Sequence, residues 1–366
     1  MTEPKQIAVE EPAVEGPPVG AQLNKRNTII SSVVTLIVLV IVFWKIIPMF
    51  GDYGAAIASI KAMSFAWVMA LVGAVLLTIF VYVFPLTAAV PGLKYGQGFV
   101  VRQTSYTISN AVPAGGAVGL ALQYAMLYSY GIPGGVATAG IAVTSVWSLF
   151  MTLGLPIFGV FAALTTGKVS SSYVVAGVVG VVAIATAVIV FALILRSEAS
   201  ARKVGEILGK LAHPITKRLK RTVDVTASIM HFREGIVDVV KERWKWITVS
   251  NILVVLTQFL ILFVAIRAVG GTKSSGFSIF AAFAAFAISR LASMIPATPG
   301  GLGTVDAALI GLLVTFGLDQ NTALAADLVW RMASFIPQVC LGIATGVWWR
   351  IHEARKAYAE SAKLLS

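Results

Sequence analysis

The sequence predicts an all-α polytopic membrane protein with about six spans and two re-entrant helical hairpins, arranged as an inverted-topology repeat. Only 12% of the 366 residues are charged and 58% are hydrophobic, whereas soluble domains carry roughly 25% charged residues. Apolar runs recur along the chain at a length of about 20 residues, which is the length that crosses a bilayer. Two further apolar segments are each interrupted by a stretch rich in proline and glycine.

The clearest interruption is Pro296-Ala-Thr-Pro-Gly-Gly-Leu-Gly303, followed by Asp306. It cannot continue a helix, because proline lacks an N–H donor and glycine readily adopts non-helical backbone. Broken backbone at membrane depth is tolerated only where it is buried in protein or lines a wet cavity. We therefore expect this tip to be part of a binding site that needs positive φ or close backbone approach. Its site residues are Pro299, Gly300, Gly301, Gly303 and Asp306.

A fainter copy of this tip lies 186 positions earlier, at Pro113-Ala-Gly-Gly-Ala-Val-Gly119. The register extends further, since a Gly-Ile or Gly-Leu pair follows each proline by 18 residues, at Gly131 and Gly317. Two broken apolar segments in corresponding halves of a membrane protein indicate the substrate site of a transporter.

The pattern divides the chain into five parts. Residues 1–24 are acidic and contain prolines, so we expect a disordered tail. Residues 25–195 form the first membrane half, with a repeat at 65–163 and a hairpin at 99–130. A basic segment (196–246), a second repeat (247–349, hairpin 277–318) and a tail (350–366) follow. The expected spans are Thr28–Ile47, Phe65–Phe84, Val136–Ala163, Tyr173–Leu195, Ile247–Ile266 and Leu324–Trp349.

Basic residues predict the orientation. Of the 28 Lys and Arg, 12 lie between Arg196 and Lys245, beside apolar spans, which indicates a cytoplasmic segment near anionic lipids rather than a nucleic-acid site. Counting six spans from this segment puts both termini in the cytoplasm, with the other basic clusters, and makes the two hairpins enter from opposite sides. The location that fits this count is a plasma membrane.

The basic segment itself is amphipathic, with apolar residues at helical spacing. We expect two helices on the membrane surface, interrupted at His213-Pro214, with the basic cluster Lys217–Arg221 facing lipid phosphates. A solvated connector between the repeats is the alternative.

Several ionisable or polar residues fall at membrane depth, where they are costly and usually functional. Asp327 precedes Arg331 by one helical turn, and Arg290 and Asp306 flank the second tip. In one interpretation these four residues neutralise one another, with Arg290–Asp306 as a structural pair. In the other, Arg331 binds a phosphate. The first hairpin contributes Arg102, Asn110, Pro113, Gly115 and Gly116.

Helix N-termini add to the positive potential that we expect. The segments after the two tips begin near Gly116-Ala117 and Gly303-Thr304, and the free N–H groups of a helix N-terminus bind anions. Together with the arginines they would suit the phosphate of a lipid head group near the middle of the bilayer.

Enzymatic motifs are missing from the sequence. There is no phosphate-binding G-x-x-x-x-G-K-[ST] loop, no H-E-x-x-H and no Gly-x-Ser-x-Gly, so we expect neither ATP-driven pumping nor a metal or other cofactor. Cys340, the single cysteine, lies in an apolar run, and we expect a buried, inert thiol.

The second tip resembles the signature of the lysylphosphatidylglycerol synthase transmembrane region, a flippase-domain family. The likeness runs from Ser289-Arg290 through Ile295–Gly303 to Asp306, and Ser109–Gly119 is similar to the family's first-half motif. It covers roughly residues 25 to 350. Arg290, Pro299–Gly303 and Asp306 carry over by motif. Asp306 stands where the family often has Glu, and the arginine often found near the first tip is absent.

The resemblance implies a translocator that moves a phospholipid or a polyprenyl-phosphate-linked lipid between leaflets. Synthases of the family append a soluble acyltransferase domain, but 17 residues follow Trp349 here, so we do not expect aminoacyl transfer. Two alternatives stay open. One is a non-transporting scaffold for an envelope glycosyltransferase, and the other is a membrane enzyme that uses Asp306 or Asp327 as a base.

Overall fold

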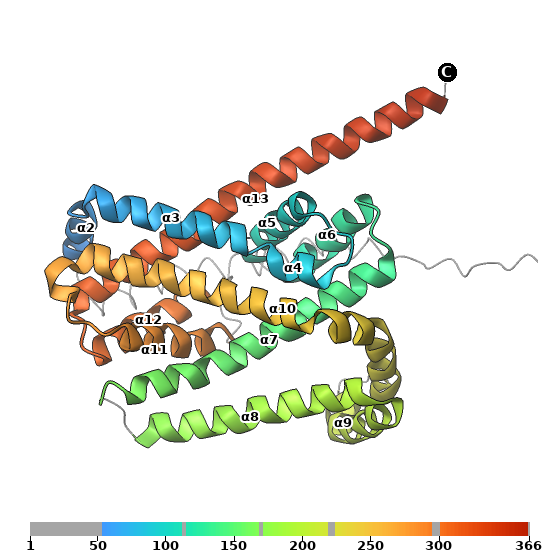
Figure 1. Ribbon diagram of the computed structural model, residues 1–366, viewed down its shortest axis with the longest axis horizontal. Helices are drawn as coiled ribbons and strands as arrows, with labels where there is room; N and C mark the ends of the chain where they lie inside the picture. Colours follow the sequence, from blue (N-terminus) through green and yellow to red (C-terminus); the bar gives the residue numbers. More distant parts are fainter. Residues whose placement is uncertain (1–52, 112–114, 168–170, 219–223, 295–300, 365–366) are drawn as a thin grey trace, which may run out of the picture.

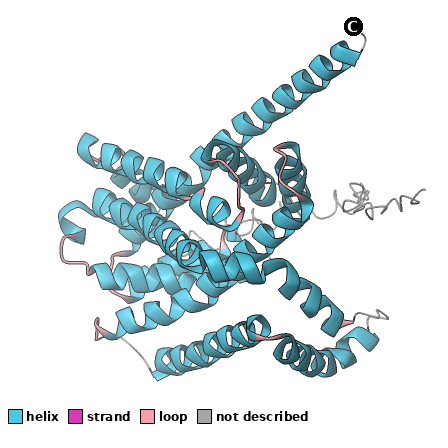
Figure 2. Cartoon of the chain, turned by 45° about the vertical axis from the view of Figure 1, so that its right-hand side comes forward, coloured by secondary structure: helices cyan, strands magenta, loops and turns pink. Residues whose placement is uncertain are grey.

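The computed structural model describes residues 53–111, 115–167, 171–218, 224–294 and 301–364, and this part of the chain contains helices and no strand (Figures 1 and 2). Four of its helical segments are long and apolar enough to cross a membrane: Phe65–Ala89, Gly134–Leu164, Val225–Gly270 and Gln320–Glu353. A membrane-embedded, multi-pass protein is therefore confirmed. The expected tail 1–24 and the first span, Thr28–Ile47, lie outside the described residues.

The bundle begins with α2 (Tyr53–Lys61), α3 (Phe65–Val81) and the short α4 (Phe84–Ala89). Helices α7 (Gly134–Leu164) and α8 (Ser171–Arg196) pack side by side (Figure 1). The largest apolar core joins α3, α10 (Val225–Gly270), α11 (Ile279–Ser289) and α13 (Gln320–Leu364).

Two pairs of short helices occupy the places of the predicted hairpins. The first pair is α5 (Tyr95–Ala111) and α6 (Gly115–Ser129). The second is α11, continued by a 3-10 turn at Arg290–Met294, and α12 (Thr304–Thr315). All four helices have 17 residues or fewer, which is shorter than the roughly 20 residues that span a bilayer.

Both pairs end in the same local structure. Gly131 has a φ of 78° and Gly317 a φ of 108°. The next residue donates five positions back in each case, Ile132 N–H to the Leu127 carbonyl at 3.1 Å and Leu318 N–H to that of Leu313 at 3.0 Å. This is a helix C-cap that needs a left-handed residue, for which glycine is suited. The 18-residue register of the sequence thus corresponds to matching helix ends.

The two halves exchange their main contacts. Helix α5 packs along α13, the last helix of the second half, and α11 packs along α7, the last helix of the first. Small residues permit the close approach of α11, since a Cβ on Gly159 of α7 would lie 2.7 Å from the Ala287 Cβ. Each hairpin is therefore held by the half to which it does not belong.

Two expectations for the basic segment are wrong. Helix α9 (Glu198–Arg218) continues through His213 and Pro214, because a single proline removes one intrahelical hydrogen bond without always ending a helix. The second surface helix is not a separate element, since Val225–Gly270 is one 46-residue helix whose N-terminus is capped by Asp224. No proline interrupts that stretch.

The thiol of Cys340 is exposed on the outside of the bundle, not buried as expected. Apolar sequence indicates burial in a soluble protein, but in a membrane helix it is equally compatible with a face toward lipid.

Candidate functional site

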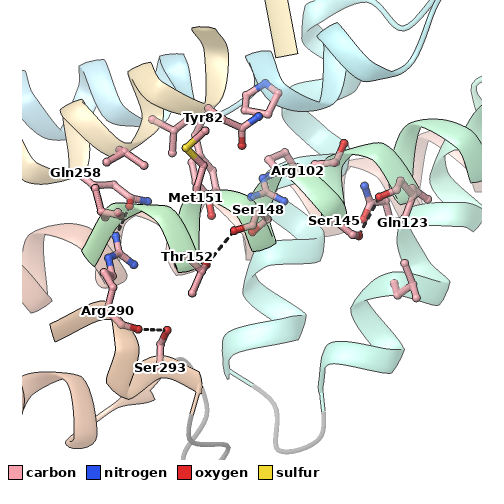
Figure 3. A pocket seen from close by; sticks show the side chains of 18 residues that line it. Tyr82, Arg102, Gln123, Ser145, Ser148, Met151, Thr152, Gln258, Arg290 and Ser293 are labelled. Atoms are coloured by element: carbon pink, nitrogen blue, oxygen red, sulfur yellow. Dashed lines mark hydrogen bonds between the residues drawn. The ribbon is translucent and has the colours of Figure 1, made fainter. Parts of the chain in front are cut away.

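A polar cavity of about 430 Å³ lies between the two hairpins. Its wall combines Arg102 and Gln123 from the first hairpin, Arg290 and Ser293 from the second, and side chains of α7 and α10 (Figure 3). Residues far apart in the sequence thus meet around one space inside the membrane region.

Arg290 lies where α11 turns into the 3-10 segment. Its guanidinium stands 4.9 Å from the centre of the Phe286 ring, and it donates to the side-chain oxygen of Gln258. Its buried Nε has no partner. A neutral amide satisfies a hydrogen bond but leaves the positive charge uncompensated, so this arginine can still attract an anion.

Arg102 enters the same cavity from α5. It lies 4.2 Å from the centre of the Tyr82 ring, and its Nε is likewise buried without a partner. Tyr82 in turn meets Tyr106 edge to face at 5.8 Å between ring centres. Arg102 precedes Pro113 by 11 residues and Arg290 precedes Pro299 by 9. The first hairpin therefore supplies an arginine from within its first helix, although none stands close to its tip.

The lining of the cavity includes these two arginines and no Asp or Glu. Its remaining polar groups are neutral, hydroxyls from α7 and amides such as Asn251 and Gln258. Two uncompensated guanidinium groups in a partly enclosed, low-dielectric space favour an anionic ligand, and arginine matches phosphate in particular.

Sequence reasoning missed most of the cavity wall on the two long helices. On α7 the hydroxyl residues Thr144, Ser148 and Thr152 recur every fourth position, and on α10 Asn251 and Gln258 are seven apart. Such spacing places the polar groups on one face of each helix. A search for polar stripes inside apolar spans would have found them.

A second charged group lies apart from the cavity, where α12 meets α13. The Asp306 Oδ1 accepts from Arg331 Nε at 2.7 Å, with Arg331 Nη2 at 2.5 Å from the same oxygen. The Asp306 Oδ2 accepts from the backbone N–H of Gly303 at 2.5 Å. The expected Arg290–Asp306 pair is therefore wrong. Asp306 also supplies negative charge to the α12 N-terminus, where we expected a ligand.

Asp327 belongs to this second group. Asp306 and Asp327 are each 1% exposed, and their side chains interact with each other. Within the described part of the chain Asp327 forms no salt bridge, because Arg331 pairs with Asp306 instead.

The tips are described only in part. Gly301 and Gly303 have φ angles of 67° and 87°, which confirms the expected positive φ, whereas Pro113, Pro299 and Gly300 lie outside the described residues.

The remaining first-hairpin residues have local roles. Glycine is required at Gly115 because a Cβ would clash with the Ile108 carbonyl of α5, while Gly116 faces open space. Asn110 donates from its amide to the Tyr106 carbonyl at 2.8 Å.

The structure thus separates the predicted site residues into two groups. Arg102 and Arg290 line the cavity, whereas Asp306, Asp327, Arg331 and Asn110 are not among its lining residues.

Residues 29–342 match the family described as Lysylphosphatidylglycerol synthase TM region. A comparison with curated proteins finds no match.

Proposed function

Because the chain belongs to the Lysylphosphatidylglycerol synthase TM region family, we propose that it is a lipid translocase. It moves a phosphate-bearing lipid, a phospholipid or a polyprenyl-phosphate-linked lipid, between the leaflets of its membrane. The observation that carries this proposal is the cavity that receives one uncompensated arginine from each hairpin and has no acid in its lining.

The mechanism follows from the chemistry of that cavity. A lipid phosphate binds between Arg102 and Arg290, which replace its hydration with charge-assisted hydrogen bonds. The hydroxyl and amide groups of α7 and α10 solvate the rest of the head group, and the acyl or prenyl chains stay in the surrounding lipid. No covalent step is required, so the protein acts as a translocator rather than as an enzyme. A non-transporting scaffold would instead need tight apolar packing between the hairpins, and the polar cavity favours transport.

The test is transbilayer movement of labelled phospholipids in liposomes that contain the purified full chain. We expect Arg290→Gln and Arg102→Gln each to lower the rate per folded molecule at least about tenfold, the equivalent of ~1.4 kcal/mol. Arg267→Gln is the matched control, because Arg267 also packs on a phenylalanine, at 5.0 Å from the Phe263 ring centre, but is not a cavity residue. Wild-type rates in the Arg102→Gln, Arg290→Gln double variant would overturn the proposal.

We further propose that the two hairpins are re-entrant and related by an inverted repeat. The matching C-caps at Gly131 and Gly317 and the exchanged packing of α5 and α11 support this arrangement. In a Cys340→Ala background, cysteines at Gly134 and Asn321 should react with an impermeant thiol reagent from opposite sides of the membrane. Reaction from the same side contradicts the repeat.

The same proposal sets the orientation in a plasma membrane. The basic segment 196–246 faces the cytoplasm, together with both termini, and binds anionic lipid head groups there. Binding to vesicles with and without anionic lipid, at low and high salt, tests this contact, since an electrostatic attraction weakens with ionic strength.

A further inference from the structure

Most of the buried polar side-chain atoms without a partner in the described part of the chain lie on one seam, where α13 packs against α5. On α13 they are the Asp327 Oδ1, Trp330 Nε1, Ser334 Oγ and Gln338 Oε1, and on α5 they are both amide atoms of Gln103. The α13 positions follow helical spacing, so they form a stripe along one face.

Such atoms are not left dry in native proteins. A buried polar group without a partner costs roughly 1–3 kcal/mol, and where space allows it is satisfied by ordered water. The stripe from Asp327 to Gln338 covers 11 residues, about 16 Å at the α-helical rise. A file of water along this seam would satisfy all of these groups.

The seam closes beyond Gln338. Thr107 donates to the Gln338 carbonyl at 3.3 Å, and the Thr104 and Thr345 hydroxyls are 2.9 Å apart. A Cβ on Gly346 would lie 3.0 Å from Thr104 Cγ2, which leaves no room for water. The polar path therefore ends on this side at the threonines and leads on the other side to Asp327.

The charges around Asp327 do not balance. The groups that act on it electrostatically are Asp306 of α12 and Arg331 of α13, so two carboxyl groups share one guanidinium. Arg290 and Tyr106, from the second and first hairpins, act next on Arg331. A charge in excess inside a low-dielectric bundle needs a counter-charge, because burying it alone is costly.

We propose that Asp327 binds a monovalent cation, a proton or Na⁺, which reaches it through water along the seam between α5 and α13. Contact between two carboxyl groups is the geometry in which a cation is shared. The inference deepens the proposed function, since a cation site next to the second tip would couple lipid movement to an ion gradient. Cation binding itself can be measured without any lipid movement, so the two proposals can fail separately.

The first experiment measures the melting temperature of the purified full chain in detergent. Bound Na⁺ raises it when choline is replaced by Na⁺ at about pH 8, and a bound proton raises it between about pH 8 and pH 6. A cation at about ten times its dissociation constant should give a rise of about 2–4 °C.

The response that belongs to the site is lost in Asp327→Asn and kept in the matched control Asp238→Asn, whose side chain is exposed. A response to Na⁺ or to pH that Asp327→Asn leaves unchanged, or no response at all, overturns the cation site.

The second experiment tests the water path through thiol reactivity, because the reactive species is the thiolate, which forms in water and not in lipid. We expect Ser334→Cys in a Cys340→Ala background to react with a small, water-soluble methanethiosulfonate at least about tenfold faster than Cys340 of the wild-type chain. Cys340 is a suitable control because it lies on the same helix and faces outward. Equal, slow rates at the two positions overturn the path.

Discussion

Arg290 and Arg331 lie in neighbouring parts of the same membrane bundle and have opposite partners. Arg331 donates to the carboxylate of Asp306, which also holds the N–H of Gly303. Arg290 donates to the neutral amide of Gln258 and lines the cavity together with Arg102. Both guanidinium groups lie over aromatic rings, at 4.9 Å and 5.0 Å, so the ring contact does not distinguish them.

The difference teaches how to separate a structural from a functional arginine at membrane depth. A guanidinium that already pairs with a carboxylate is electrically satisfied, and its loss strands a buried negative charge. One that meets only neutral acceptors keeps its charge for a ligand. We therefore assign Arg331 to holding the second tip and Arg290 to binding, which reverses the expectation from the sequence.

The largest expected effect is on stability, from Asp306→Asn. It leaves Arg331 without its carboxylate and should cost about 3–5 kcal/mol of unfolding free energy, measured by thermal or denaturant unfolding in detergent. Arg290→Gln should cost less, since Gln258 loses only a neutral hydrogen bond. The Asp306→Asn, Arg331→Gln double variant should recover much of the loss. Equal costs for Asp306→Asn and Arg290→Gln would remove the distinction between the two arginines.

A smaller loss is expected from Gly301→Val, which tests the tip that the Asp306–Arg331 pair supports. The positive φ of 67° is unfavourable for a β-branched residue, and a Cβ would lie 2.8 Å from Val305 Cγ2. Strain of this kind costs roughly 1–3 kcal/mol. The control is Gly73→Ala in α3, where a Cβ meets nothing within 4 Å. A Gly301→Val chain that melts like the wild type contradicts the backbone requirement.

The smallest change turns Arg290 into a copy of Arg331. Gln258→Glu would give Arg290 a carboxylate partner, so we expect the melting temperature to be kept while lipid movement falls about tenfold, ~1.4 kcal/mol. Gln258→Leu is the companion variant, because it removes the hydrogen bond without adding charge and should retain transport. Undiminished transport in Gln258→Glu would show that the charge of Arg290 is not used.

The sequence by itself determined the membrane class, the apolar helices and the ends of both hairpins. These features depend on local chemistry. A helix ends at Gly131 or Gly317 because hydrogen bonds between atoms no more than five residues apart require a left-handed residue there. Positive φ at Gly301 and Gly303 was predictable for the same reason.

Only the tertiary structure decided which charges meet. Proximity along the chain suggested Asp327 for Arg331 and Asp306 for Arg290, yet Asp306 pairs with Arg331 across 25 positions. Arg102 and Arg290 reach one cavity although they belong to different halves. The cause is physical: a buried charge takes the partner that helix packing brings within a few ångströms, and sequence spacing does not specify which helices α12 and α5 pack against.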